Sequence, residues 1–472
     1  MLRGDRRSPQ HLASAAACGP PNHASGDGGG AALGNNGDMG SRSRPFSPAN
    51  ADENAHPWQD KRRALWALSR TAAGLLYPRD TPPRDLKGVA TCRWAVISKL
   101  DGVDVNLSSY EATGQRRASF GGLQTCGLVW RCPACAARIS ETRRRQVNEG
   151  LAWAKGQGFR IAMLTLTARH GAGDDLAALL SGMKVAKRMF HRHRAWRRIK
   201  PEIVALLTAT EVTHGRNGWH PHFHVLVIVR TAEAEAALSR LGDVWRASLR
   251  GQGLDGAAAA FDCQSASAAG RYVAKWGSAE ELTLGGKKRA RSGGKTPLQL
   301  LEAAKAGSEG AAALWLEYVA AFHRRNQLDG LKKLVDLYGG EQISDEEAAQ
   351  DERQDDQARD DEPLLNIDHD TWRSRARSRR TDILDAAEVG GALAVREVIH
   401  GPPKPRRRCP DPPVIDEDDQ WHDELLAALA DRACPEGEEP PDSWTPPPMR
   451  AGGLAARALA AIRRDTGAAP PL

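Results

Sequence analysis

The stretch His220-Pro221-His222-Phe223-His224-Val225-Leu226 places a histidine at every second position of a predicted β-strand. Because alternate side chains of a strand lie on one face of the sheet, we expect the three imidazoles to share a face, which Leu226 and Ile228 continue. Three neighbouring neutral imidazoles suit a divalent metal ion. The alternatives are a solvent-facing polar stripe and histidines hydrogen-bonded to the backbone, and the context of the stretch favours the metal.

A carboxylate precedes the histidines on a second predicted strand. The two strands and their turn are Ala205–Thr213, His214–Trp219 and His220–Val229. The turn contains Asn217-Gly218, a strong hairpin signal, and the width of the loop decides whether Glu211 pairs opposite His224 or His222. Two imidazoles and one carboxylate leave coordination positions open, which favours Mg²⁺ or Mn²⁺ acting on a phosphate over a structural zinc. A rim carboxylate paired with an arginine is the alternative for Glu211.

The remaining apolar patterns alternate between strand and helix. The expected elements are a buried strand at Ile161–Thr167, a helix capped by Asp174, an amphipathic helix at Thr231–Arg250, a weak strand near Ala257–Cys263 and a helix from about Ser265 to Trp276. The apolar side of the helix capped by Asp174 should carry Leu176, Leu179, Leu180, Met183, Ala186 and Phe190. The apolar side of the Thr231–Arg250 helix should carry Leu238, Leu241, Trp245 and Leu249. This order predicts an α+β fold, an antiparallel sheet with helices packed on one face.

Three clustered thiols indicate a second metal site. Cys126 is followed by Cys132 and Cys135 in a C-P-x-C arrangement, and Cys92 is the best candidate for the fourth ligand that zinc usually requires. The expected ion is a structural Zn²⁺, separate from the histidine site. Isolated buried thiols are the alternative. The eight cysteines of the chain are too sparse for a disulfide scaffold.

The segment from Lys184 to Lys200 contains eight Lys and Arg residues and no acidic residue. With Arg143–Arg145 it is a candidate phosphate-contacting surface, although a solvated helix face is an equal alternative. The DNA-binding candidates are Lys184, Lys187, Arg188, Arg192, Arg194, Arg197 and Arg198.

Composition limits the class of protein. The 472 residues include 66 Lys+Arg and 59 Asp+Glu, a net charge of +7. No apolar run approaches the ~18–20 residues that span a bilayer, and the first residues lack the apolar core of a secretory signal, so we expect a cytoplasmic protein without membrane contact. Leu65–Leu76 is expected to form a docking helix, whereas the acidic stretch Glu341–Asp370 and the following Arg- and Pro-rich segments predict a solvated tail.

The histidine strand, together with Thr210–Thr213 and Leu164–Thr167, resembles the plasmid rolling-circle replication initiators of the HUH endonuclease superfamily. The resemblance covers about Cys92 to Trp276. It implies that His222 and His224 are metal ligands with Glu211 as third, and His220 less firmly so. Together with the composition of the two ends, the resemblance predicts a mostly disordered tail at 1–85, a cysteine-rich zinc lobe at 86–145, the HUH catalytic domain at 146–282, a helical extension at 283–340 and a mostly disordered tail at 341–472.

The resemblance also implies a tyrosine nucleophile on a helix after the histidines. Of the five tyrosines, Tyr272 has this position. Lys275 lies three residues further on the same side of a helix, where its ammonium would lower the pKa of the phenol or neutralise the charge that develops on the phosphate. Packing of Tyr272 in the core is the alternative. Some members carry a glutamate one turn before the tyrosine, where this chain has Ala268, so their termination step does not transfer.

The expected function is therefore that of a metal-dependent, site-specific DNA endonuclease and strand transferase. It would nick single-stranded or cruciform plasmid origin DNA, form a covalent 5′-phosphotyrosine and leave a 3′-OH primer. No Walker-type phosphate loop occurs in the sequence, so a host helicase and a host DNA polymerase are expected partners. A transposase or relaxase with the same chemistry, and a non-catalytic zinc DNA-binding protein, remain alternatives.

Overall fold

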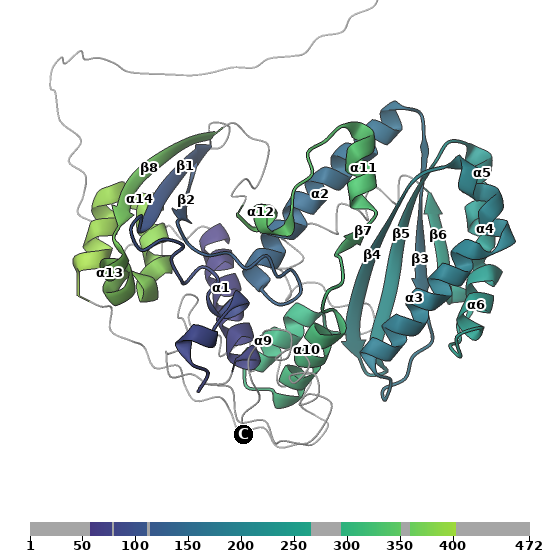
Figure 1. Cartoon of the computed structure of the whole chain (residues 1–472), viewed down its shortest axis with the longest axis horizontal. Helices are drawn as coiled ribbons and strands as arrows, with labels where there is room; N and C mark the ends of the chain where they lie inside the picture. The colour runs from purple at the N-terminus through teal and green to yellow at the C-terminus, as the bar shows by residue number, and fades with distance from the viewer. Residues whose placement is uncertain (1–56, 78–79, 111–113, 266–293, 351–358, 403–472) are drawn as a thin grey trace, which may run out of the picture. The chain divides into compact units, whose positions relative to one another are not determined.

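An antiparallel five-stranded sheet carries the histidine strand. The computed structural model describes residues 57–77, 80–110, 114–265, 294–350 and 359–402. The sheet consists of β3 (Arg160–Thr167), β4 (Ile203–Gly215), β5 (Gly218–Val229), β6 (Phe261–Ser265) and the short β7 (Leu328–Asp329). Its strand order is β6-β3-β5-β4-β7, so the histidine strand β5 lies at the centre between β3 and β4 (Figure 1).

The β4–β5 hairpin selects one of the two expected registers. Gly215 pairs with Gly218, so the turn is Arg216-Asn217, one residue earlier than the expected Asn217-Gly218. Gly218 has φ +79°, and a Cβ there would lie 2.6 Å from the Gly171 carbonyl oxygen, so only glycine fits. The resulting register places Glu211 directly opposite His222.

Helices cover both faces of this sheet, so the expectation of helices on one face is wrong. On one face, α3 (Leu176–Arg192) and α6 (Gly242–Arg250) pack on a cluster that includes Val225 and Val227. On the other, α2 (Pro133–Gly156) and α11 (Leu331–Tyr338) pack on Leu226 and Ile228. The reason is that β5 is apolar on both of its faces beyond His224, and each apolar face requires a cover.

The helices that flank the sheet keep their expected inner sides. All six expected positions of α3 are buried, but its N-cap is Asp175, which accepts a hydrogen bond from the Ala178 N–H at 2.7 Å. Asp174 instead accepts from the Gly171 N–H at 2.7 Å, within the preceding loop. The expected helix at Thr231–Arg250 is divided into α5 (Ala232–Leu238), a 3₁₀ turn and α6, and its expected inner residues are all buried.

The other elements lie before and after the sheet in sequence. The helices are α1 (Pro57–Leu76), α4 (Arg194–Ile199), α9 (Pro297–Lys305), α10 (Glu309–Ala321), α12 (Asp345–Gln350), α13 (His369–Thr371) and α14 (Arg380–His400). Short 3₁₀ turns occupy Pro83–Asp85, Gly88–Ala90, Lys200–Glu202, Ser239–Leu241, Ala258–Ala260 and Arg377–Arg379, and a π-helical turn occupies Trp372–Ala376. No helix in the described ranges is both long enough and apolar enough to cross a membrane.

A second sheet, of strand order β2-β1-β8, contradicts part of the expected C-terminal tail. It consists of β1 (Val103–Tyr110), β2 (Gln115–Gly121) and β8 (Arg359–Ile367). β8 pairs antiparallel with β1 although it lies in the acidic stretch, and α14 contacts β1 and β2 (Figure 1). The excess of acidic residues in this stretch predicted a solvated tail because net charge takes no account of a strand such as β1 that is distant in sequence.

The charges of α14 are neutralised by α1. Glu388 is 5% exposed and accepts hydrogen bonds from Gln59 Nε2 at 2.7 Å, Arg62 Nη1 at 2.7 Å and the Ala118 backbone N–H at 2.9 Å. Asp385 forms ion pairs with Arg62 and Arg63. A carboxylate with this set of donors is buried without an orphaned charge, so an acidic segment becomes part of the core.

Candidate metal centres

Glu211, His222 and His224 converge on one point of the sheet. His222 Nε2 lies 3.0 Å and His224 Nε2 lies 3.3 Å from Glu211 Oε2. One ligand atom from each of the three residues lies within 4.8 Å of the others. Two imidazole nitrogens and a carboxylate oxygen at these distances can hold a divalent ion and leave further coordination positions open.

Local structure explains this convergence. His222 and His224 are two residues apart on β5 and share a face, and the register brings Glu211 of β4 onto that face. His224 is fully buried, and its Nδ1 lies 3.3 Å from Thr165 Oγ1 on β3. Thr165 belongs to the threonine-rich strand that carried part of the resemblance. The contact orients the imidazole so that Nε2 faces Glu211, as second-shell partners of metal ligands do.

The electrostatics of the site favour an ionised carboxylate. Partial burial raises the pKa of Glu211, but hydrogen bonds from His222 and His224 lower it more, and the net pKa lies well below the ordinary value of 4.5. His222 Nδ1 is buried without a hydrogen-bond partner among the described residues. A donor set of this composition fits a cation at the position that the two Nε2 atoms and the carboxylate face.

His220 lies outside the group of ligand atoms that Glu211, His222 and His224 form, so its assignment as a ligand stays a prediction. Its Nδ1 lies 2.7 Å from His170 Nε2, and His170 Nδ1 lies 2.8 Å from the Asn217 carbonyl oxygen. Burial, followed by the charges of His222 and His170, lowers the pKa of His220 to about 4. His170 was missed by the sequence analysis, since it lies in a loop 50 residues away and belongs to no motif.

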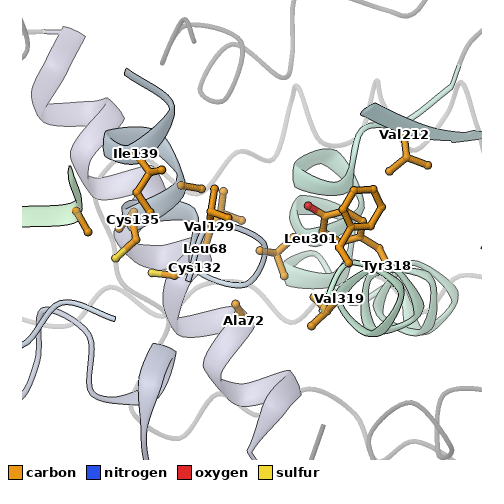
Figure 2. Packing of buried hydrophobic residues seen from close by; sticks show 14 of the residues in the cluster. Leu68, Ala72, Val129, Cys132, Cys135, Ile139, Val212, Leu301, Tyr318 and Val319 are labelled. Atoms are coloured by element: carbon orange, nitrogen blue, oxygen red, sulfur yellow. The ribbon is translucent and has the colours of Figure 1, made fainter. Parts of the chain in front are cut away.

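The four expected cysteines form a second cluster. Sγ–Sγ distances are 3.4 Å for Cys92–Cys135, 3.6 Å for Cys126–Cys135 and 3.8 Å for Cys132–Cys92. Four sulfurs around a tetrahedral zinc with ~2.3 Å bonds would be about 3.8 Å apart. The structure thus brings Cys92 to the three clustered thiols and fits a tetrathiolate ion site, and Figure 2 shows Cys132 and Cys135 on α2 beside α1.

The start of α2 favours thiolates in this cluster. Cys132 is the N-cap residue of α2 and Cys135 lies in its first turn, where the helix dipole stabilises negative charge. Hydrogen bonds from Cys126, Cys132 and Cys92 lower the pKa of the Cys135 thiol, whereas hydrogen bonds within the cluster and burial raise the pKa of the Cys132 thiol, so in the absence of an ion the negative charge is held at Cys135. Cys263 is half-buried on β6, outside the cluster, and burial raises its pKa to about 11.

The basic segment Lys184–Lys200 forms the C-terminal half of α3 and all of α4. Its predicted DNA-binding side chains are exposed, with the exception of Lys187. Lys184, Arg188, Arg192, Arg194, Arg197 and Arg198 are exposed. Lys187 instead lies half-buried, donates to Thr208 Oγ1 at 3.1 Å and has its Nζ 5.1 Å from the ring centroid of Phe223. This surface lies over the face of the sheet opposite the histidines. Arg143 and Arg144 pair with Asp345 and Glu141, so they are engaged within the protein.

The expected nucleophile lies outside the described residues. Tyr272, Lys275 and Ala268 fall within 266–293, for which no placement is described. Of the other tyrosines, Tyr318 is 7% exposed, and burial raises its pKa above the ordinary value of 10. Tyr338 donates its hydroxyl to Glu149 Oε2 at 3.1 Å.

Comparison with known proteins matches a segment that contains the histidine site and most of the cysteine cluster. Residues 123–235 match the family model described as "Replication protein". The chain is 35% identical to "Protein rep" of Streptomyces lividans over 23% of this chain and 30% of that protein. It is 30% identical to "Neomycin resistance protein" of Streptomyces cyanogenus over 27% of this chain and 39% of that protein. It is 28% identical to "Protein rep" of Streptococcus pneumoniae serotype 2 over 25% of this chain and 39% of that protein.

These alignments span about a third of the length of each relative. No solved structure matches the chain. The matched segment contains Glu211, His222, His224 and three of the four clustered cysteines. The comparisons confirm the resemblance to the plasmid replication initiators over residues 123–235, the part of the chain that matches the replication-protein family model.

Proposed function

We propose that this protein initiates rolling-circle replication of a plasmid by nicking and rejoining one strand of the origin. The observation that carries the proposal is the convergence of Glu211, His222 and His224 within the segment that matches the replication-protein family. A structural role alone would not require two imidazoles and a carboxylate to meet with open coordination positions.

Glu211, His222 and His224 would hold the catalytic divalent ion. A bound Mn²⁺ or Mg²⁺ supplies a Lewis acid for the scissile phosphate, and the two imidazoles favour Mn²⁺ within this pair. The ionised Glu211 supplies the negative charge of the ligand set. Thr165 maintains the orientation of His224, so the ligand atoms are arranged before DNA arrives.

Tyr272 would provide the nucleophile. Its phenolic oxygen attacks the phosphorus and forms a P–O bond, the bond from phosphorus to the 3′-oxygen breaks, and that oxygen takes up a proton as the free 3′-OH. The 5′-phosphate stays on the tyrosine. Attack of a DNA 3′-OH on this linkage rejoins the strand and restores the tyrosine. Lys275 would stabilise the charge that develops on the phosphate oxygens.

The cysteine cluster and the basic helices would support this reaction without taking part in it. The four clustered cysteines would bind a structural Zn²⁺ that joins the start of α2 to the loops containing Cys92 and Cys126. The exposed cations of α3 and α4 would contact phosphates of origin DNA. A host helicase and a host DNA polymerase would unwind the duplex and extend the 3′-OH.

A covalent-adduct assay tests the proposal. The protein is incubated with Mn²⁺ and labelled single-stranded oligonucleotides that tile the plasmid origin, and the products are separated under denaturing conditions. The wild type should give a labelled protein band, and Tyr272→Phe should give none while melting at the same temperature. Tyr338→Phe is the matched control and should keep the adduct. An adduct with Tyr272→Phe would place the nucleophile on another residue.

A further inference from the structure

A cavity of about 280 Å³ lies beside the Glu211 end of β4. The residues that line it come from the edge of β4, the N-terminal half of α2, helices α9 and α10, and the segment Gln327-Leu328. The residues of β4 that line it run from Ala209 to Thr213. Among the described residues, β7 pairs only with Thr208 and Ala209, and Lys295 pairs with His214 further along β4. The cavity lies beside β4 between these two contacts.

One wall of the cavity is aromatic and fixed in position. Trp130, Tyr318 and Phe322 line it together, with ring centroids 6.4 Å apart for Trp130–Tyr318 and 4.8 Å apart for both Trp130–Phe322 and Tyr318–Phe322. The Trp130 indole donates to the Arg325 carbonyl oxygen at 2.7 Å, which holds the ring. Figure 2 shows Tyr318 of α10 beside Leu301 of α9 and below Val212 of β4.

A polar group at the cavity lacks a partner. The Gln327 amide nitrogen donates to Ser140 Oγ at 2.7 Å, whereas Gln327 Oε1 is buried without a hydrogen-bond partner among the described residues. Reversing the amide would let Ser140 donate to the oxygen and would leave the amide N–H unmatched instead. In either orientation, one buried polar atom of this cavity-lining residue lacks a hydrogen bond, and leaving it unsatisfied is unfavourable.

We propose that this cavity binds one unpaired nucleobase of the origin strand, next to the scissile phosphate. The inference rests on the proposed function, because Glu211 both lines the cavity and belongs to the metal centre. A backbone phosphate at the ion would therefore place a neighbouring base within reach of the cavity.

The chemistry of the cavity matches a base better than it matches a chain segment. Its volume lies just below the roughly 300–1,000 Å³ of small-molecule pockets, so it has room for a flat ring and not for an extended strand. Every nucleobase offers a face for stacking on an aromatic side chain. Every base also has an N–H or an acceptor on its Watson–Crick edge, which can satisfy the unmatched atom of Gln327.

Direct binding measurements test the cavity without requiring catalysis. The full chain is titrated, without added divalent ion, into fluorescein-labelled dC12 and into a 12-residue abasic strand that has the same phosphates. Leu298→Trp, from α9, fills the cavity, Gln327→Leu removes its polar group, and Gln342→Leu, at an exposed glutamine outside the cavity, is the matched control. Melting temperatures of all variants report on folding.

We expect Leu298→Trp to weaken dC12 binding by roughly tenfold, as for the loss of one stacked base, and to leave the abasic strand unaffected. Gln327→Leu should weaken dC12 binding about threefold, in the range of one hydrogen bond. Folded variants that bind dC12 as the wild type does would overturn the base pocket. Loss of abasic binding as well would assign the effect to phosphate contacts and also overturn it. If both variants bind dC12 more weakly as expected but the wild type forms no covalent adduct, the base pocket is supported and the proposed nicking function is wrong.

Discussion

The substitution Cys132→Ser should remove zinc from the cysteine cluster and destabilise the fold. Cys132 is 1% exposed, and its Sγ lies 3.8 Å from Cys92 Sγ and 3.7 Å from Ser69 Oγ of α1. A serine there replaces one of four thiolates by a hydroxyl that does not ionise near neutral pH. The ion would lose one ligand, and α2 would lose its connection to the loops that carry Cys92 and Cys126.

The magnitude follows from the loss of a bound metal, one of the few single changes that cost more than about 4 kcal/mol of unfolding free energy. For domains of 150–250 residues, each 1 kcal/mol lowers the melting temperature by about 2–4 °C. Cys132→Ser should therefore lower it by about 8–16 °C. Cys263→Ser is the matched control, because Cys263 is half-buried outside the cluster and its change should cost about 1 kcal/mol or less.

Zinc per chain is measured by atomic emission on protein purified without chelator, and melting is followed by circular dichroism. The wild type and Cys263→Ser should contain one Zn²⁺, and Cys132→Ser should contain much less. A wild-type protein without zinc would refute the reasoning. Equal zinc content and equal melting temperatures for Cys132→Ser and Cys263→Ser would refute it as well.

Three further predictions concern other parts of the molecule. Burial, followed by the charge of Lys187, lowers the pKa of His191 from 6.5 to about 4. Between these two pH values the unfolded chain binds a proton at His191 that the native chain does not bind, so the unfolding free energy, measured by urea titration, should fall from pH 6.5 towards pH 4. The fall should be smaller in His191→Gln. Glu388→Gln should cost about 3–5 kcal/mol in the same titration and leave zinc bound, whereas a cost near zero would mean that its partners do not hold α14. Arg192→Gln with Arg197→Gln should reduce the slope of log affinity for duplex DNA against log salt by roughly 0.9 each, and an unchanged slope would remove α3 and α4 from the DNA interface.

The sequence predicted the local features of the candidate site. The alternation of histidines on β5 determines which side chains share a face, and the turn limits the position of Glu211 to two registers. In the structure the turn ends at Gly218, which must be glycine because of its positive φ and its close approach to the Gly171 carbonyl, 47 residues earlier in the chain. No local pattern encodes such a contact, so the hairpin was predicted but its turn was displaced by one residue.

Features that depend on distant partners could not be predicted. His220 is paired with His170 across 50 residues, a contact that its place in the alternation did not predict. Lys187 lies in a cationic run, yet its position on α3 directs it onto the sheet. The acidic C-terminal stretch gained a strand, β8, and a buried carboxylate, Glu388, because arginines more than 300 residues earlier supply the opposite charge.

Binding of Mn²⁺ tests the central claim, that Glu211, His222 and His224 form a metal centre. Zinc-loaded protein is titrated with Mn²⁺, and the free ion is followed by electron paramagnetic resonance. The wild type and His220→Ala should each bind one Mn²⁺ per chain. The double variant His222→Ala, His224→Ala should bind none at the same concentrations and should keep its zinc and its melting temperature. Binding of Mn²⁺ by the double variant with wild-type affinity would contradict the account.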